Sequence, residues 1–404
     1  MSIIYLIFVL LAVYFSFRYD GIEEYDSHKQ HRLWLMCLYL IFLTGFSYGL
    51  GGDKFVYMRE FEEYPSNFSE AGDYIWLQFM LRSQMPLWTL VNMFGKAVFN
   101  SFYFVQLVQS AAINTAVCYI ASKYTHRYFI FLLAYFFTLQ YFIFNTEIMR
   151  EGFAMSFALI GMHNWINGKK WIFFVMFLLA LMLHVSAVTM LIFPFVHFRV
   201  SWKTIIIAFF IALGIWLFSD FILVRVMLSV FGGMGALVQK VLFYSIRAST
   251  IFGFLRSSLT YLIFPFVIMY TSMVMEPSEE LRKCKEKMIS FTVILAILAS
   301  SLAGFTRLYN YAQIFYLIMM ADFLYTLFRE KNHLMIRMGT LAGTLFFLML
   351  RYMTPYNTTN TRFYDFFYPY TCILNEDKSV FIREIAHEEA VNAEESDNNV
   401  RNLE

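Results

Sequence analysis

The amino-acid sequence predicts an all-α protein that crosses a membrane many times. Of its 404 residues, 59% are hydrophobic and only 15% are charged, whereas a soluble globular domain is nearer half apolar and a quarter charged. The apolar residues also gather in segments that suit membrane-spanning helices, which need roughly 20 residues for a hydrocarbon core about 30 Å thick. We therefore expect a polytopic transmembrane helical bundle of about 10–12 spans.

The expected spans follow one another along the chain with few long interruptions. Residues 2–17 have no basic region ahead of them and no small-residue cleavage site, so we expect this span to be retained rather than removed as a signal peptide. Residues 171–198 would form a helix roughly 42 Å long if straight, so we expect two short helices hinged at 184–187. The expected spans are 2–17, 33–50, 102–122, 128–146, 150–167, 171–184, 186–198, 204–219, 251–275, 288–305, 307–328 and 338–353.

The distribution of Lys and Arg predicts the orientation of the bundle. Six short connections on one side carry 16 of the 31 basic residues, and short basic loops stay in the cytoplasm. The longer segments 51–101 and 220–250 are therefore expected outside, with 85–99 as an amphipathic helix in the outer interface. We expect a single transmembrane domain over 1–370 and a polar, flexible tail over 371–404.

Charge and cysteine content exclude several classes of function. The net charge of +2 is too small to indicate a nucleic-acid partner. The four cysteines have no paired spacing, so they predict neither a disulfide framework nor a metal site.

The first concentration of charge follows the second span, in FSYGLGGDKFVYMREFEEYP. If the residues after the Gly-Gly turn are helical, Asp53 and Tyr57 share one face. Asp53 could cap a short solvated helix, or it could act as a general base or orient a sugar hydroxyl at the membrane surface. The neighbouring aromatic rings favour the second interpretation, because such rings suit both the interface and sugar faces.

The strongest signal is NTEIMREGFAM, which places Glu147, Arg150 and Glu151 between two apolar spans. Their spacing predicts a shared helical face. They could form an ion pair between two helix ends, but charges near hydrocarbon are costly and often mark function. Gly152 would permit close packing beside Arg150. The planar guanidinium of Arg150 matches phosphate oxygens, which favours an anionic ligand.

Two further polar residues stand out at expected outer junctions. His184 lies in the apolar stretch LMLHVSAV, either as a hydrogen-bonded packing residue or as an acid or base. Ser186 could cap the second half of the hinged helix. Arg307 in AGFTRLYNYAQ either reaches lipid headgroups or serves the same site, with Tyr309 beside it. A carboxylate, a histidine and two arginines on one side could hold a lipid-linked pyrophosphate with its glycan pointing outward.

Short motifs in order along the chain resemble the EpsG-type family of bacterial polysaccharide polymerases, which are Wzy-like in role. The matching elements are Gly51, Asp53 and Tyr57; Pro86 to Trp88; MREGFA from Met149 to Ala154; His184, Ser186 and Ala187; Arg307 and Tyr309; and Tyr368 to Tyr370. Two positions depart from the family pattern. Gln84-Met85 stands where an acidic residue usually falls, and Glu151 replaces a glutamine.

The resemblance implies an inner-membrane glycosyltransferase that polymerises undecaprenyl-pyrophosphate-linked oligosaccharide repeat units at the outer face of the bacterial plasma membrane. Its product would be an exopolysaccharide, a capsule or an O-antigen. The fold would resemble integral-membrane glycosyltransferases with lipid-phosphate donors. The implied partners are the lipid-linked oligosaccharide, membrane lipids, a chain-length regulator and a glycan flippase.

Within that resemblance each candidate residue has an expected role. Asp53 or His184 would accept the proton of the attacking hydroxyl, and Arg150 and Arg307 would bind the pyrophosphate. No cofactor is required, because arginines can stabilise the leaving charge, although a divalent metal remains compatible with the set. The residues expected to contact the glycan or order the loop are Tyr57, Arg59, Glu147 and Tyr309.

Two other classes of function fit parts of the sequence. A transporter or flippase of lipid-linked glycans would need arginines along a path through the bilayer, whereas the expected spans carry almost no charge in their middle. A polytopic sugar acyltransferase with His184 as its base would need a cytosolic thioester donor, and the cytoplasmic loops are short.

Overall fold

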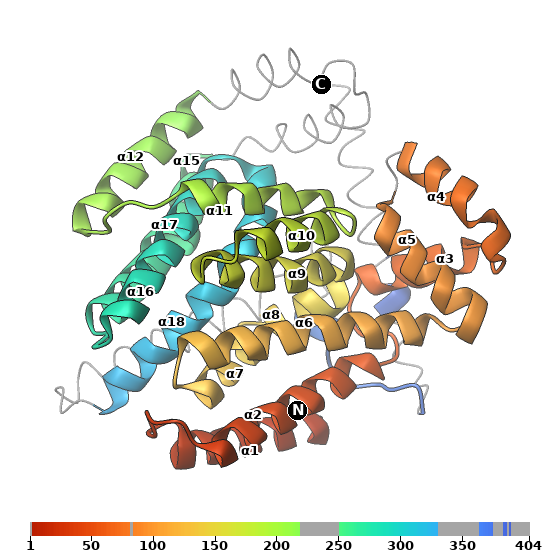
Figure 1. Ribbon diagram of the computed structural model, residues 1–404, viewed down its shortest axis with the longest axis horizontal. Coiled ribbons are helices and arrows are strands. Elements are labelled where there is room, and N and C mark those ends of the chain that lie inside the picture. The colour runs from red at the N-terminus through yellow and green to blue at the C-terminus, as the bar shows by residue number, and fades with distance from the viewer. Residues whose placement is uncertain are drawn as a thin grey trace. The chain divides into compact units, whose positions relative to one another are not determined.

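The computed structural model describes residues 2–80, 84–218, 250–329, 363–374, 383–385 and 388. Every regular element in these ranges is a helix, apart from an isolated bridge between Ser47 and Cys372 (Figure 1). The expected all-α class is confirmed. The expected span 338–353 and nearly all of the segment 220–250 lie outside the described residues.

Several helices have the length and composition of membrane spans. Among the described residues, Phe102–Tyr124, Ile251–Val274 and Phe305–Phe328 qualify, and the bent pair Tyr128–Phe137 with Gln140–Glu147 would make a fourth. Shorter apolar helices occupy four more of the expected spans. These helices identify a helical membrane protein, while the count of 10–12 spans stays a prediction.

The chain forms two compact units. The first comprises Met1–Phe157, Met182–His184 and Tyr325–Glu404, and the second comprises Ala158–Leu181 and Val185–Leu324. Each is described below by itself.

In the first unit, α1 (Ile3–Tyr19) packs on α7 (Tyr128–Phe137), and α2 (Ser27–Gly45) packs on α6 (Phe102–Tyr124). The segment after α2 forms α3 (Asp53–Glu63), η1 (Phe68–Glu70), α4 (Ala71–Met80), α5 (Pro86–Phe94) and the π-helix η2 (Gly95–Phe99). Pro86 begins α5, a position where the missing proline N–H costs nothing. The helix expected at 85–99 is thus α5 with η2.

The expected straight span 128–146 is instead broken, and this is a correction to the sequence prediction. α7 ends at Phe137, Leu139 has a φ of 62°, and the chain continues at 77° to α7 through α8 (Gln140–Phe142) and the π-helix η3 (Ile143–Glu147). Backbone groups freed at such a break need other partners away from water. The Gln109 side chain on α6 supplies one of them, because its Nε2 donates to the backbone carbonyl of Phe144 (2.8 Å). The Asn114 side chain, also on α6, donates to the side-chain oxygen of Asn145 in η3 (3.0 Å).

The helix after the break, α9 (Met149–Ile166), packs closely against η3 because Gly152 has no side chain. A Cβ built at residue 152 would collide with the carbonyl oxygen of Phe144. The close packing expected at Gly152 is therefore confirmed.

The second unit is built around α17 (Glu279–Ser301). Two groups of elements pack on α17 from before it in the chain: α12 (Trp202–Leu217), and the consecutive helices α15 (Ile251–Ser257), η6 (Ser258–Ile263) and α16 (Phe264–Val274). The 3₁₀-helix η7 (Ala303–Tyr309), which follows α17, also packs on it and leads into α18 (Asn310–Arg329). The Lys285 ammonium is buried and pairs with Glu276 and Asp322 at 2.7 Å each, which ties α17 to α18 and to the turn after α16.

The expected break within 171–198 is confirmed, although it lies at 182–184 rather than at 184–187. α10 (Lys170–Leu181) stops before Met182, and the chain resumes as the 3₁₀-helix η4 (Val185–Leu191) and α11 (Ile192–Phe195). Ser186 does not cap the second helix as the sequence suggested. It lies inside η4, and its hydroxyl is 2.9 Å from that of Tyr311.

The segment after η8 (Phe363–Phe366) returns to the first unit and pairs with the residues that follow α2. Tyr48 N donates to Thr371 O (3.0 Å), and Ile373 N donates to Phe46 O (3.1 Å). The buried Arg383 donates to Gly49 O and to Thr371 Oγ1, both at 3.1 Å. Part of the segment expected to be a flexible tail is therefore packed.

We predict that Gly152→Ala destabilises the protein by about 1–3 kcal/mol, because the new methyl group would force α9 away from η3. Thermal unfolding of the detergent-solubilised protein measures this. Gly72→Ala is the matched control, since a Cβ at residue 72 meets nothing within 4 Å. Equal melting temperatures for the two variants would contradict the close packing.

Candidate functional site

The N-terminus of α3 is capped by a side chain from a distant part of the chain. The Glu147 carboxylate accepts hydrogen bonds from the backbone N–H groups of Gly52 (2.9 Å) and Asp53 (3.3 Å). The first amides of a helix have no partners within the helix and carry partial positive charge, so a carboxylate is well placed there. The preceding residue, Gly52, has no side chain to cap α3 itself. Glu147 therefore fixes the position of Asp53.

The turn before α3 lies too close to η3 for a side chain. Gly51 has a φ of +88°, and a Cβ there would lie 2.6 Å from Thr146 Oγ1 and 2.8 Å from Glu147 Oε1. Glycine alone adopts this conformation readily and leaves the required space. The Gly-Gly turn thus brings the backbone amides of residues 52 and 53 to the Glu147 carboxylate.

One face of α3 carries Asp53, Tyr57 and Glu60, at spacings of four and three residues, and Tyr64 follows directly after the helix. The Arg150 guanidinium, at the start of α9, lies 5.3 Å from the centre of the Tyr57 ring. This distance allows a cation–π interaction. A cation at a helix N-terminus is otherwise unfavourable, so the ring face and the nearby acidic groups compensate Arg150.

A half-buried carboxylate lies on the same face. Gln84 Nε2 donates to Glu60 Oε2 (3.2 Å), and Tyr64 Oη donates to Gln84 Oε1. Burial raises the pKa of Glu60, and the positive charge of Arg150 opposes that shift. Burial likewise raises the pKa of Tyr57 to about 12. Tyr57 is therefore a neutral ring at physiological pH, and the pKa of Glu60 lies above the ordinary value of a glutamate.

The hinge that holds His184 meets this site through α5. Leu87 N donates to Met182 O (2.8 Å), two residues before the half-buried His184. The next residue of α5, Trp88, is buried and packs edge-on against Tyr57, with 5.8 Å between ring centres. The structure thus connects Asp53, Tyr57, Glu147 and Arg150 directly and links the His184 hinge to them through the start of α5.

A second cation lies under the same turn. Lys54 is fully buried, and its Nζ donates to Ser47 O (3.0 Å) and Ser47 Oγ (2.9 Å). Burial, and then the charge of Arg383, lower the pKa of Lys54 well below its ordinary value. Lys54 is thus a structural group that holds the turn between α2 and α3.

The other predicted site residues have different surroundings. Arg59 is exposed and pairs with Glu388 (3.2 Å). Arg307 and Tyr309 belong to η7 in the second unit, where Arg307 is exposed. Tyr309 is buried against the ring of Tyr261. Glu147 and Arg150 do not share a helical face as predicted, because Ile148 separates η3 from α9.

Sequence reasoning missed Glu60 and Gln84 as members of the site. The signal for Glu60 was present, because residues 53, 57 and 60 follow helical spacing. Gln84 gave no such signal, since its contact with Glu60 spans 24 residues of chain. The site therefore combines the Arg150 guanidinium, which can bind an anionic group, with the carboxyl groups of Asp53 and Glu60, which can accept a proton. Within the described residues, no three His, Cys, Asp or Glu side chains are grouped to hold a metal ion.

Comparison with known proteins gives one match. The model of the EpsG family matches residues 32–372, which is most of the chain. No curated protein and no solved structure matches the chain.

We predict that Glu147→Ala accelerates hydrogen exchange of the Gly52 and Asp53 amides by about tenfold or more. This corresponds to the loss of about 1.4 kcal/mol or more from the two hydrogen bonds that the buried Glu147 side chain accepts. Exchange followed by mass spectrometry measures it. Glu63→Ala, an exposed change near the other end of α3, should leave these amides unaffected. Unchanged exchange in Glu147→Ala would show that the cap does not hold the helix start.

Proposed function

Because the chain belongs to the EpsG family, which is associated with polysaccharide polymerisation, we propose that it joins oligosaccharide repeat units carried on undecaprenyl pyrophosphate. The reaction would take place at the outer face of the bacterial plasma membrane. The observation that carries this proposal is the convergence of Asp53, Tyr57 and Glu60 of α3 with Arg150 of α9. A polymerase of this kind needs a cation for the pyrophosphate and a base for the acceptor within one site.

The proposed reaction is a single displacement at the anomeric carbon of the donor. An acceptor sugar hydroxyl attacks this carbon, and its proton passes to a base on the protein. The bond between the anomeric carbon and the pyrophosphate oxygen breaks, and both bonding electrons leave with the lipid pyrophosphate. The transition state has oxocarbenium character, and one displacement inverts the anomeric centre.

Arg150 is proposed to bind the leaving pyrophosphate. Its guanidinium cannot lose its proton in this pH range and can donate two parallel hydrogen bonds to phosphate oxygens. The Tyr57 ring beneath it holds the guanidinium without neutralising it. A half-buried cation also acts more strongly on developing charge than one in bulk water. Arg307 is proposed as a second pyrophosphate ligand because of its exposed position at the start of a helical span.

Asp53 is proposed as the base, with His184 as the alternative. The Glu147 carboxylate beside Asp53 holds the start of α3, so the Asp53 side chain projects from a fixed point. Two neighbouring carboxylates repel each other as anions, which favours proton uptake by the pair. Glu147 is thus proposed to position Asp53 rather than to contact the glycan.

The outer location is proposed from the short basic connections, which favour the cytoplasm. The segment that contains α3 to η2 is then external. A chain-length regulator and a flippase that delivers the donor are proposed partners, because the donor is built on a lipid and the product is a polymer.

We predict that Arg150→Ala leaves the protein in the membrane but reduces polymer formation at least 100-fold, so that glycans remain as single repeat units. This corresponds to about 2.7 kcal/mol or more of lost transition-state stabilisation, the range found for single oxyanion donors. Arg150→Lys should retain only a small part of the wild-type polymer formation, because a lysine ammonium lacks the planar, two-pronged geometry of a guanidinium. Gel analysis of glycan length measures both.

Arg282→Ala is the matched control for Arg150, because Arg282 is an exposed arginine on α17 outside the proposed site. It should polymerise normally. Long polymer in Arg150→Ala would remove the proposed pyrophosphate ligand.

A second prediction concerns the acid side of the pH–rate profile. Wild-type activity should fall as the pH drops through the raised pKa of Glu60, because protonated Glu60 no longer offsets the positive charge of Arg150. Glu60→Gln should be slower and should lack this acid limb, whereas Glu63→Gln should keep it. Initial rates in vitro measure the profiles.

The same shift predicts an opposite effect on stability. A carboxyl with a raised folded pKa binds its proton more tightly in the folded state, so its contribution to stability falls as pH rises from about 4.5 to that raised pKa. The stability of Glu60→Gln relative to wild type should therefore be higher at neutral pH than at acid pH. A variant that loses both activity and stability at neutral pH would count against a functional role for Glu60.

A further inference from the structure

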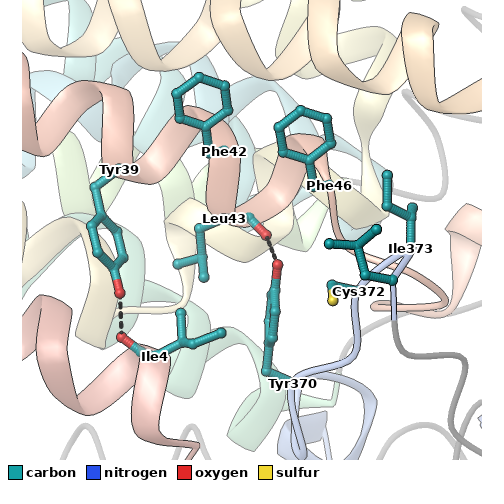
Figure 2. Close-up of a pocket in the computed structure, with 9 residues that line it drawn as sticks. Ile4, Tyr39, Phe42, Leu43, Phe46, Tyr370, Cys372 and Ile373 are labelled. Atoms are coloured by element: carbon teal, nitrogen blue, oxygen red, sulfur yellow. Dashed lines mark hydrogen bonds between the residues drawn. The ribbon is translucent and has the colours of Figure 1, made fainter.

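An apolar groove runs along α2 in the first unit. Its volume is about 480 Å³, within the range of small-molecule sites. Figure 2 shows its lining: Tyr39 and Phe42 from α2, Phe46 directly after α2, and Tyr370, Cys372 and Ile373 from the returning segment. Phe42 and Phe46 stack face to face, with ring centres 5.4 Å apart and planes 3° from parallel. The groove is therefore walled by rigid aromatic surface.

The tyrosine hydroxyls of the groove are already used within the protein. Tyr39 Oη donates to Ile4 O (2.8 Å), and Tyr370 Oη donates to Leu43 O (3.0 Å), as the dashed lines in Figure 2 show. Among the described residues, no charged side chain lines the groove. The groove thus offers hydrocarbon contact and little that could recognise a sugar or an ion.

The groove ends close to the proposed site. Phe46 is followed by Ser47, which bridges to Cys372, and then by the turn that leads to Asp53. Six residues lie between Phe46 and Asp53, so their Cα atoms are at most about 25 Å apart over seven steps of the chain, and the turns make the real distance shorter. The short segment between Phe46 and Asp53 therefore joins the groove to the proposed site.

The polar end of the groove carries a positive charge. The Arg383 guanidinium donates to Thr371 Oγ1 and to Gly49 O, beside the bridge at Cys372. Because this cation is buried, its field is weakly screened. An anionic headgroup would be favoured at this end, and a hydrocarbon chain would be favoured along the rest.

We propose that this groove binds the polyprenyl tail of the lipid-linked donor, with the pyrophosphate at the Arg383 end, toward Asp53. This inference rests on the proposed function, because only a lipid that carries the reacting group gains from a groove that leads to the site. A tail on α2 can enter sideways from the bilayer without crossing water. Binding the tail would hold the donor while successive repeat units are added.

A filling variant tests the groove by kinetics. Ile373→Trp should raise the KM for a donor with a full-length polyprenyl tail about tenfold and leave unchanged the KM for a donor whose tail is cut to two isoprene units. Leu38→Trp is the matched control, because Leu38 is an exposed residue of α2 that does not line the groove. It should change neither KM. Equal KM values for Ile373→Trp and Leu38→Trp with the long-tailed donor would overturn the proposal.

A binding measurement that needs no polymerisation gives the second test. Cys372 lies in the groove as a half-exposed free thiol, Cys37 and Cys118 are buried, and Cys284 can be replaced by Ser. In that background, a long-chain polyprenyl phosphate should slow maleimide labelling of Cys372 at least fivefold. Phosphatidylglycerol at the same concentration should not. Equal labelling with both lipids would show that ordinary acyl chains fill the groove.

The two tests separate failure of the groove from failure of the function. If wild-type protein polymerises no lipid-linked donor but polyprenyl phosphate still protects Cys372, the proposed reaction fails and the lipid site stands. If Arg150→Ala abolishes polymerisation while Ile373→Trp behaves like Leu38→Trp, the reaction stands and the groove proposal is wrong. A Cys372 thiol that labels at the same rate with and without polyprenyl phosphate also overturns it.

Discussion

The candidate site depends on one interaction, the cap that Glu147 places on the start of α3. Two backbone N–H groups of α3 point at a carboxylate that lies 95 residues further along the chain from Gly52. Without that carboxylate, the helix would begin at a Gly-Gly turn with no side chain to satisfy its first amides. Asp53 would then stand on a frayed end. The direction of the whole α3 face, and hence the meeting of Tyr57 and Glu60 with Arg150, follows from this cap.

The cap in turn requires the break after α7. A straight span from 128 to 146 would carry Glu147 away from the turn, whereas the 77° bend returns it to Gly52. A break inside a membrane protein is tolerated only where the freed backbone finds partners. The buried Gln109 of α6 donates to the backbone carbonyl of Phe144, and Asn114 of α6 donates to the side chain of Asn145. Gly152 lets α9 pack directly against the Phe144 carbonyl. Polar residues in an otherwise apolar helix therefore serve the geometry of the site.

Local periodicity explains what could be predicted from the sequence. Helical spacing places Asp53 and Tyr57 on one face of α3, as the structure shows. Helix length predicts a break at 184–187, and the structure has it at 182–184. The bend could not be predicted, because Leu139 adopts a positive φ where neither Gly nor Pro marks the position. The contacts of Glu147, Gln84 and Arg383 join residues far apart in sequence, and spacing carries no information about such pairs. For this reason Glu147 was assigned to the glycan, although its oxygens bind backbone amides.

The distribution of charge separates scaffold from site. Lys54 and Arg383 are buried and donate to backbone carbonyls and hydroxyls of the turn, so their hydrogen bonds are used in holding the chain. Arg150 is half-buried and instead lies over the aromatic face of Tyr57, which attracts a cation. Burying a charge is costly, and structural cations offset that cost with several fixed acceptors. Lys54 and Arg383 therefore support the turn, whereas Arg150, beside the Tyr57 ring and the Glu60 carboxyl, is the cation proposed to bind the anionic donor.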